Sequence, residues 1–220
     1  MRSCEWRDLG SMPWREAFAL QRTLVEERKR GAIPDQLLIV EHPHVVTLGR
    51  NSDGSNILAA PEVLERAGIA VEIADRGGDV TYHGPGQIVG YTIFDLREWK
   101  RDVGEFVRAM EQALIDAIGR FGVAGERLAG LTGVWVGGGK VAAIGVHLSR
   151  WVSSHGFALN VDTDLSYFRY IVPCGLTRPV TSLRDLGCGA TRAEVVAALV
   201  ASFARIFDRD MHEPLTLETR

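Results

Sequence analysis

Residues 133–148, GVWVGGGKVAAIGVHL, place two apolar segments on either side of a run of three glycines. This pattern predicts a β-hairpin, because glycine adopts the positive φ angles that a tight turn between two strands requires. Strands joined by a tight turn pair antiparallel. A further strand pattern follows at residues 155–162. We therefore expect a mixed or antiparallel sheet and not a doubly wound parallel one.

Helical and strand patterns alternate along the rest of the chain. The helix at 102–121 has the clearest pattern, with Asp102 and Glu105 resembling a capping box. Thr191 and Glu194 form a second capping box, which opens the last helix. We expect an α+β fold, a mixed sheet flanked by helices, in one domain over residues 1–220, with the last helix as a candidate appendage. Helical patterns cover 14–30, 61–68, 102–121 and 191–206, and strand patterns cover 36–42, 44–50, 69–75, 88–96, 133–148 and 155–162.

Two local details are also expected. Ser11 is a candidate N-cap for the first helix, since Pro13 stands in its first turn. The strand pattern at 44–50 follows the one at 36–42 so closely that the two are expected to pair.

Composition excludes several classes of protein. The net charge is −3, which gives no general attraction to nucleic acid or to an anionic membrane. No apolar run approaches the roughly 18 residues of a membrane span. The N-terminal residues lack the apolar region of a signal peptide, so we expect a cytoplasmic protein. Its three cysteines are widely spaced, which favours free thiols over a disulfide framework.

The glycine-rich stretch at 76–91, RGGDVTYHGPGQIVGY, is the first candidate for chemistry. It is not a GxGxxG motif that opens a helix, and GGGK at 137–140 fails as a phosphate loop because Val134 and Val141 replace required residues. What remains is a loop whose backbone can approach a ligand closely, or a tight structural loop with solvated polar groups. Its candidate lining residues are Arg76, Asp79, Thr81, Tyr82, His83 and Gln87.

Cys174 is the candidate nucleophile. It stands between a proline and a glycine, in IVPCGLTRP, which predicts a turn. A thiol needs a neighbouring base or cation to act as a nucleophile, and otherwise a free cysteine is a small buried apolar residue. Lys140, His83, His147 and His155 are the candidate partners, and the residues alone do not choose among them.

His42 and His44 would point to the same side of a strand and could bind a metal. No cysteine or carboxylate cluster accompanies them, so we expect no metal site.

Three blocks of the sequence resemble the lipoyl(octanoyl) transferase family. They are RGGDVTYHGPGQIVGY, GVWVGGGKVAAIGVHLSRW and HGFALNVDTDLSYFRYIVPCG, which occur in the family's order between Arg76 and Gly175. HPHVVTLGR, upstream, is also similar to the family. Residues 1–30 and 190–220 carry little of this resemblance.

The resemblance implies a fold similar to the catalytic domain of biotin ligases and lipoate–protein ligases. It implies an acyltransferase that moves octanoate from octanoyl-acyl carrier protein to a lysine of lipoyl domains. Those acceptors belong to 2-oxoacid dehydrogenase complexes and to the glycine cleavage H protein. No cofactor is implied, and a monomer is expected.

The resemblance also implies roles for particular residues. Cys174 matches the nucleophile that carries the acyl group as a thioester, and Lys140 matches its activating partner. Backbone N–H groups of the glycine-rich loop could contact the thioester oxygen. Three segments match the substrate-binding residues: Arg76, Gly77, Gly78, Asp79, Val80, Thr81, Tyr82 and His83; Ala143, Ile144 and Gly145; Gly156, Phe157 and Ala158.

Three other functions stay open at this point. An ATP-dependent lipoate–protein ligase would use the same fold and a lysine without needing Cys174. An octanoyl amidotransferase would move the acyl group between lipoyl-domain proteins through a thioester. A non-catalytic protein could bind an acyl group or a lipoyl domain in the same pocket.

Overall fold

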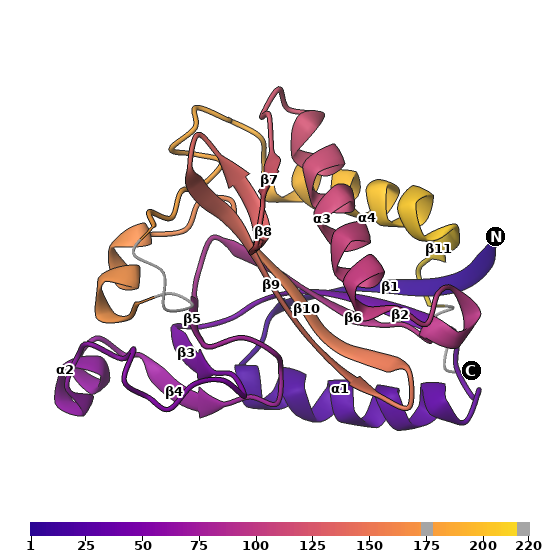
Figure 1. The fold of residues 1–220 in the computed structure, drawn as a ribbon, viewed down its shortest axis with the longest axis horizontal. Coiled ribbons are helices and arrows are strands. Elements are labelled where there is room, and N and C mark those ends of the chain that lie inside the picture. The colour runs from indigo at the N-terminus through magenta and orange to yellow at the C-terminus, as the bar shows by residue number, and fades with distance from the viewer. Residues whose placement is uncertain (173–177, 215–220) are drawn as a thin grey trace, which may run out of the picture.

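A computed structural model describes residues 1–172 and 178–214 of the chain, and its largest element is an eight-stranded sheet (Figure 1). Its strands are β1 (Arg2–Ser11), β2 (Asp35–Glu41), β6 (Gln87–Ile93), β7 (Glu126–Leu128), β8 (Leu131–Val136), β9 (Gly139–Ser149), β10 (Val152–Asn160) and β11 (Arg209–His212). Their order across the sheet is β11-β1-β2-β6-β10-β9-β8-β7. β1 pairs in parallel with β11 and β2, and the other neighbours pair antiparallel. The sheet is therefore mixed, as predicted.

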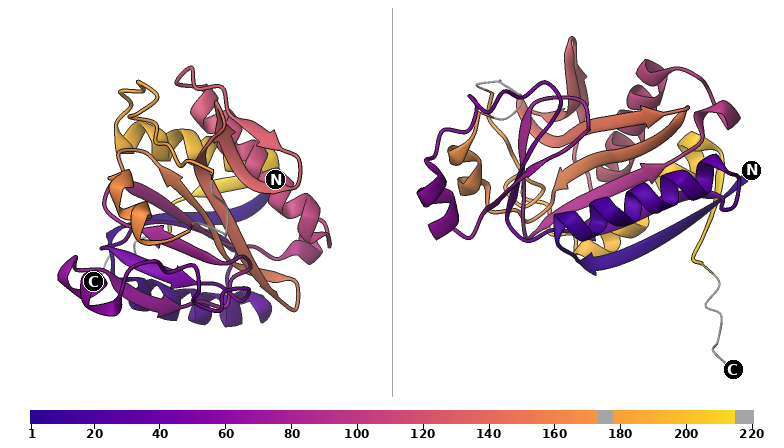
Figure 2. Two further views of the ribbon diagram at one scale, coloured as in Figure 1. Left: turned by 60° about the vertical axis from the view of Figure 1, so that its left-hand side comes forward. Right: turned by 90° about the horizontal axis from the view of Figure 1, so that it is seen from below.

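Helices cover both faces of this sheet (Figures 1 and 2). α3 (Val103–Gly119) and α4 (Arg192–Phe207) lie on one face, and α1 (Trp14–Lys29) lies on the other. Successive side chains of a strand point to opposite faces, so each strand contributes to two cores. In β10, Leu159 packs in the core under α3 and α4, whereas its neighbour Ala158 packs in the core under α1. The predicted α+β fold is confirmed.

The helix caps follow the sequence in two of three cases. The Asp102 side chain accepts a hydrogen bond from the N–H of Glu105 at the start of α3. Thr191 and Glu194 form a complete capping box at the start of α4. The expected cap at Ser11 is wrong, because Ser11 ends β1 and Pro13 precedes the first helical residue.

The last helix is not an appendage. Leu199, Phe203 and Phe207 of α4 are fully buried in the same core as α3. Phe203 also stacks on Phe157 of β10, with 5.3 Å between the ring centroids. α4 is therefore part of the layer that covers the sheet.

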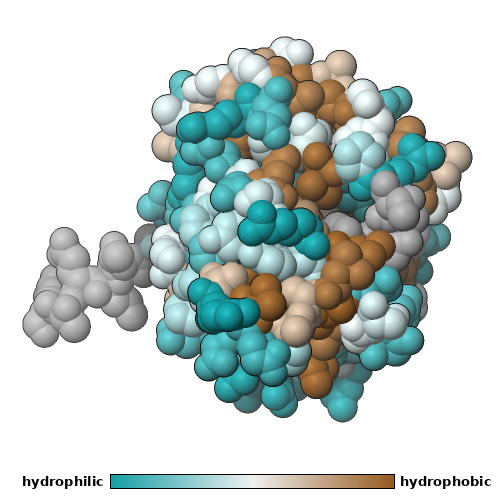
Figure 3. All heavy atoms as spheres, turned by 90° about the vertical axis from the view of Figure 1, so that its left-hand side faces the viewer, coloured by the Kyte–Doolittle hydropathy of each residue, from teal (hydrophilic) through white to brown (hydrophobic). Residues whose placement is uncertain are grey.

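A second, three-stranded sheet has the order β4-β3-β5, with β3 (Val45–Leu48), β4 (Ala70–Ile73) and β5 (Val80–His83). It lies beside α2 (Pro61–Arg66) and the 3₁₀ helix η2 (Leu165–Tyr170). Apolar and hydrophilic patches alternate on the face that shows this end of the molecule (Figure 3). The expected pairing of 44–50 with 36–42 is wrong, because β1 and β6 already occupy both edges of β2.

The glycine-rich stretch is only partly a loop. Its centre forms β5 and its end enters β6. Four of its five glycines flank the strands, and Gly90 lies within β6. Gly78 and Gly86 have φ angles of +83° and +79°, which glycine adopts without strain. The β-branched and aromatic residues between them favour a strand.

A buried ion network ties α1 and β11 to β2. Asp35, at the start of β2, accepts hydrogen bonds from Arg28 Nε and Arg209 Nε, each at 2.8 Å. All three residues are buried. Within the described part of the chain, no helix is long and apolar enough to cross a membrane.

Candidate functional site

The β9–β10 hairpin forms one wall of the candidate site. Ala143 pairs with Ala158, and Gly145 pairs with Gly156. These small residues line the same cavity and leave room above the strands. A larger residue would not fit at Gly156, since a Cβ there would lie 2.2 Å from the carbonyl oxygen of Gly90.

The loop that precedes β5 covers this hairpin. The N–H of Gly77 donates to the carbonyl of Val146 at 2.9 Å, and a Cβ on Gly145 would lie 2.9 Å from the Gly77 oxygen. The guanidinium of Arg76 donates to the carbonyl of Thr47 at 2.7 Å. The loop is therefore fixed against β9 and β3, and the Gly77 N–H is not available to contact a thioester oxygen.

Two adjacent cavities lie between this loop, β5 and the hairpin. The first has a volume of about 50 Å³, and the second, of about 20 Å³, continues it toward Lys140. They share Thr81, Ala143 and Ala158 as lining residues. We call them together the acyl track, a narrow path along one face of β9 and β10 from Lys140 to His155.

Most of the predicted substrate-binding residues line this track. The alternation of β5 points Thr81 and His83 into it, whereas Val80 and Tyr82 pack in the core beside α2. Asp79 does not line it either, and instead accepts a hydrogen bond from the amide of Asn56. The predicted residues that line the track are Arg76, Gly77, Gly78, Thr81, His83, Ala143, Ile144, Gly145, Gly156, Phe157 and Ala158. Their roles remain predictions.

Lys140 stands at one end of the track. Its side chain is buried, and its Nζ lies 4.7 Å from the centre of the Trp135 ring, a cation–π contact. Among the described residues, no carboxylate lies within ion-pair distance of this amine. Its backbone pairs with the next segment, because its N–H donates to Pro179 O at 2.9 Å and its carbonyl accepts from Thr181 N at 3.0 Å.

Cys174 lies outside the described residues, so its predicted role stays a prediction. The described chain on either side of the gap at 173–177 is well anchored. Val172 donates its N–H to Asn56 O at 2.8 Å. On the other side, the guanidinium of Arg178 lies 6.0 Å from the ring of Trp135, the same ring that Lys140 contacts.

A hydrogen-bond chain fixes the protonation of His83. The amide of Asn160 donates to Thr181 O at 3.0 Å, and its oxygen accepts from Gln87 Nε2 at 2.9 Å. The remaining Gln87 oxygen faces His83 Nδ1 at 2.7 Å, so Nδ1 carries the proton and Nε2 is left as an acceptor. Burial, aided by the nearby His42, lowers the pKa of His83 to about 3. His83 is thus neutral and a weak base.

The other histidine candidates lie away from Lys140. His155 lines the opposite end of the track, where its Nε2 is 2.6 Å from Asp75 Oδ1. Burial lowers the pKa of His155, although the hydrogen bond to Asp75 opposes this. His147 lines a surface groove and not the track. Of the candidate partners for Cys174, Lys140 lines the second cavity, His83 and His155 line the first, and His147 lines neither.

His42 and His44 do not converge on one point. His42 Nε2 lies 2.7 Å from the hydroxyl of Tyr91, and His42 Nδ1 lies 2.7 Å from Met12 O. His44 Nδ1 instead lies 2.7 Å from the hydroxyl of Tyr82. Their rings are held by different groups.

Several lining residues escaped the sequence analysis. Trp14 begins α1, Val89 and Tyr91 belong to β6, and Phe168 belongs to η2. Val89 and Tyr91 lie in the first motif block and Phe168 lies in the third, whereas Trp14 lies outside all three blocks. Strand alternation could have placed Val89 and Tyr91 on one face, but only the tertiary fold brings Trp14 and Phe168 to the site.

Comparison with known proteins places the chain in a family. Residues 13–204 match the family model of the lipoyl protein ligase A/B catalytic domain. An octanoyltransferase from Solibacter usitatus is 61% identical over 96% of this chain and 96% of its own length. An octanoyltransferase from Koribacter versatilis is 51% identical over 91% of this chain and 82% of its own length.

Solved structures share the fold. A lipoate protein ligase of T. acidophilum, solved with bound lipoic acid, aligns with a TM-score of 0.79 at 17% identity, covering 96% of this chain and 88% of that one. The biotin protein ligase of Aquifex aeolicus aligns with a TM-score of 0.54 at 12% identity, covering 93% of this chain and 69% of that one. These likenesses confirm the expected fold. With the sequence relatives, they show that the chain belongs to the lipoyl protein ligase A/B catalytic domain family and, within it, to the octanoyltransferases, which are acyltransferases.

Proposed function

We propose that the protein transfers an octanoyl group from octanoyl-acyl carrier protein to a lysine of a lipoyl domain, through a thioester on Cys174. The observation that carries the proposal is the acyl track, which runs along β9 and β10 and ends at the buried Lys140. Membership of the octanoyltransferases supports the acyl group, and the position of Lys140 supports its role as the base.

The track suits an unbranched acyl chain. Ala143, Gly145, Gly156 and Ala158 leave a narrow path beside the strands, and Val89 adds an apolar wall. Burying the six methylenes of an octanoyl group, at about 0.8 kcal/mol each, contributes about 5 kcal/mol of binding free energy. Shorter acyl groups would lose part of this amount, which favours octanoyl over acetyl or butyryl groups.

In the first half-reaction, the thiolate of Cys174 attacks the thioester carbonyl of the donor. A carbon–sulfur bond to Cys174 forms, and the bond to the phosphopantetheine sulfur breaks. Lys140 takes the proton from the Cys174 thiol and returns it to the departing sulfur. Thioester exchange is nearly thermoneutral, so this step needs no ATP.

In the second half-reaction, the amine of the acceptor lysine attacks the acyl group on Cys174. An amide bond forms and the Cys174 sulfur leaves. Lys140 takes a proton from the amine and gives one back to the thiolate, which restores the free enzyme. Converting a thioester to an amide is downhill. His83 is not suited to these transfers, because its low pKa and acceptor-only Nε2 make it a weak base.

A covalent intermediate lets two protein substrates use one site in turn. We propose acyl carrier protein as the donor, with lipoyl domains of 2-oxoacid dehydrogenase complexes and of the glycine cleavage H protein as acceptors. The enzyme would thus bind one protein at a time, and its kinetics would be ping-pong.

The first test is the intact mass of the protein after mixing with octanoyl-acyl carrier protein, without ATP. A single octanoyl adduct that hydroxylamine removes is expected. The adduct should be absent in Cys174→Ala and should form far more slowly in Lys140→Met. Lys100→Met is the matched control, because Lys100 is exposed and does not line the track, so adduct formation should match wild type.

Two results would contradict the proposal. One is acylation of a lipoyl domain that requires ATP and free octanoate, which would indicate a ligase. The other is an adduct that persists in Cys174→Ala, which would place the acyl group on another residue. Lys140→Met with a wild-type rate and pH profile of adduct formation would remove Lys140 from its role.

A further inference from the structure

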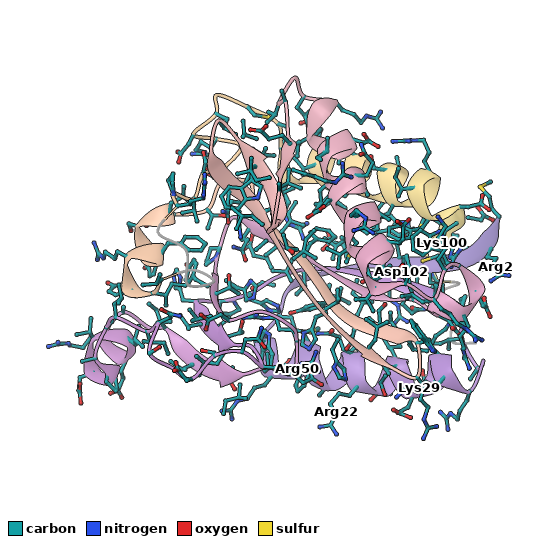
Figure 4. The ribbon with its side chains drawn as sticks, in the orientation of Figure 1. Arg2, Arg22, Lys29, Arg50, Lys100 and Asp102 are labelled. Atoms are coloured by element: carbon teal, nitrogen blue, oxygen red, sulfur yellow. The ribbon has the colours of Figure 1, made fainter. Side chains whose placement is uncertain are left out.

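The end of the acyl track opposite Lys140 is closed by a thin wall. Beyond this wall lies a surface groove between α1 and the end of the β9–β10 hairpin, with a volume of about 680 Å³. Arg22 and Lys29 of α1 line the groove, and Figure 4 shows both projecting from this helix. His147 and Ser149 of β9 continue the face of the hairpin that carries Ala143 and Gly145. The groove therefore continues the direction of the track.

Two pairs of side chains make this wall, and each pair has one member on either side. His155 lines the track and Asp75 lines the groove, with 2.6 Å between His155 Nε2 and Asp75 Oδ1. Trp14 lines the track and Phe18 lines the groove, with their rings stacked at 4.8 Å. Phe18 also stacks on His155 at 5.6 Å, which joins the two pairs.

The backbone of His155 is held in an unusual conformation. Its φ is +58°, in the left-handed region that residues other than glycine rarely adopt. In β10 the alternation sends Phe157 toward the core under α3 and α4, but the His155 ring lies on the opposite side, against α1. The buried side chain of Gln21 accepts from His155 N at 2.8 Å, and Thr92 Oγ1 donates to His155 O at 3.3 Å. The fold thus holds a strained residue so that its ring closes the track.

The track is long enough for an octanoyl group but slightly too short for a dodecanoyl group. From Asn160, beside Lys140, to Gly156, beside His155, the strand advances by about 13 Å. An extended octanoyl chain spans about 9 Å from carbonyl to methyl, and a dodecanoyl chain about 14 Å. An octanoyl group whose carbonyl lies near Lys140 fits in front of the wall, whereas a dodecanoyl group would reach it.

We infer that His155 and Phe18 form the end wall of the acyl track and set the longest acyl chain that the enzyme accepts. The inference rests on the proposed function, which places the thioester at the Lys140 end. Removing either ring should join the track to the groove, so that a longer chain can pass into the open volume beyond.

The test compares acyl adducts formed from octanoyl- and dodecanoyl-acyl carrier protein. His155→Gly removes the ring and suits the positive φ angle. Phe18→Ala opens the wall from α1 without touching the strained residue, and Phe18 is only half-buried, so the fold should tolerate it. In each variant the ratio of dodecanoyl to octanoyl adduct rate should rise by about tenfold or more over wild type. Asp75→Asn is the matched control, because it keeps the shape of the wall, and its ratio should stay that of wild type.

A second measurement separates this inference from the proposed function. Free octanoic and dodecanoic acids, tested by their effect on the thermal unfolding midpoint, report on the track without any chemistry. In the two wall variants, dodecanoic acid should raise the unfolding midpoint by more, relative to octanoic acid, than it does in wild type. If wild type forms no adduct but the wall variants show this change in unfolding midpoint, the proposed thioester mechanism is wrong and the inference about the wall is supported. If a folded His155→Gly or Phe18→Ala protein keeps the wild-type preference in both measurements, the wall inference is wrong.

Discussion

Acid should destabilise this protein partly through one buried histidine. His83 is held neutral in the folded protein, with a pKa of about 3, whereas an unfolded chain binds a proton at that side chain near pH 6.5. Between about pH 6.5 and pH 3 the unfolded state therefore binds more protons than the folded state. The free energy of unfolding must fall as the pH falls through this window.

The size of the effect follows from the two pKa values. At pH 7 the contribution of His83 is small, about 0.2 kcal/mol. At pH 5 His83 lowers the free energy of unfolding by about 2 kcal/mol, because the histidine is almost fully protonated in the unfolded chain and almost fully neutral in the folded protein. His83→Gln removes the titrating ring and keeps a polar side chain beside Gln87. The variant should lose about 2 kcal/mol less stability than wild type between pH 7 and pH 5.

The assay is urea unfolding of both proteins at pH 5, 6 and 7. Comparing the change with pH, instead of the stability at one pH, cancels any cost of the substitution itself. An equal loss of stability in wild type and His83→Gln would refute the reasoning, since it would mean that folded His83 takes up protons as freely as the unfolded chain.

Two further predictions concern stability alone. Asp35→Asn should lower the free energy of unfolding by about 3 kcal/mol, because it removes the carboxylate that pairs with the buried Arg209 and one of the carboxylates that pair with the buried Arg28. A loss below about 1 kcal/mol in urea unfolding would contradict this interpretation of the network. Gly90→Ala should cost about 1–3 kcal/mol, since a Cβ there would lie 2.2 Å from the Phe157 ring. Gly119→Ala is the control, because nothing lies within 4 Å of a Cβ there, and it should leave stability unchanged or raise it. Equal thermal midpoints for the two alanine variants would contradict the prediction, since they would show that the Phe157 ring moves aside without a loss of stability.

Local signals in the sequence predicted most of the elements. The capping residues Asp102 and Thr191 marked the starts of two helices, and the run of glycines that begins at Gly137 marked the turn between β8 and β9. Long-range pairing carried no such signal. β1 places Arg7 beside Asp8 and so lacks a regular alternation, and it is recognisable as a strand only from its pairing with β2 and β11 on either side.

The part of the candidate site that could be predicted is the part whose residues lie within continuous sequence motifs. The motif residues of β9, β10 and the loop before β5 meet because the hairpin pairs Ala143 with Ala158 and the Gly77 backbone docks on β9. Val80 and Tyr82, which were also predicted to bind substrate, pack in the core beside α2 and do not line the track, a difference that strand alternation applied to this stretch would have indicated. The end wall could not be predicted, because Phe18 belongs to the first helix. The helical spacing of its apolar residues indicates only that one face of the helix packs against the protein.

The parallel pairing of β1 with β11 has a consequence for synthesis on the ribosome. β1 is complete after the first eleven residues, but its outer edge is paired only when Arg209–His212 is added. The same late residues bring the second arginine to Asp35. Until then the nascent chain carries an exposed strand edge and a half-neutralised buried carboxylate. Cooperative closure of the sheet must therefore wait until residues 209–212 have been made, and ribosome-bound chains that stop before residue 209 should remain sensitive to protease.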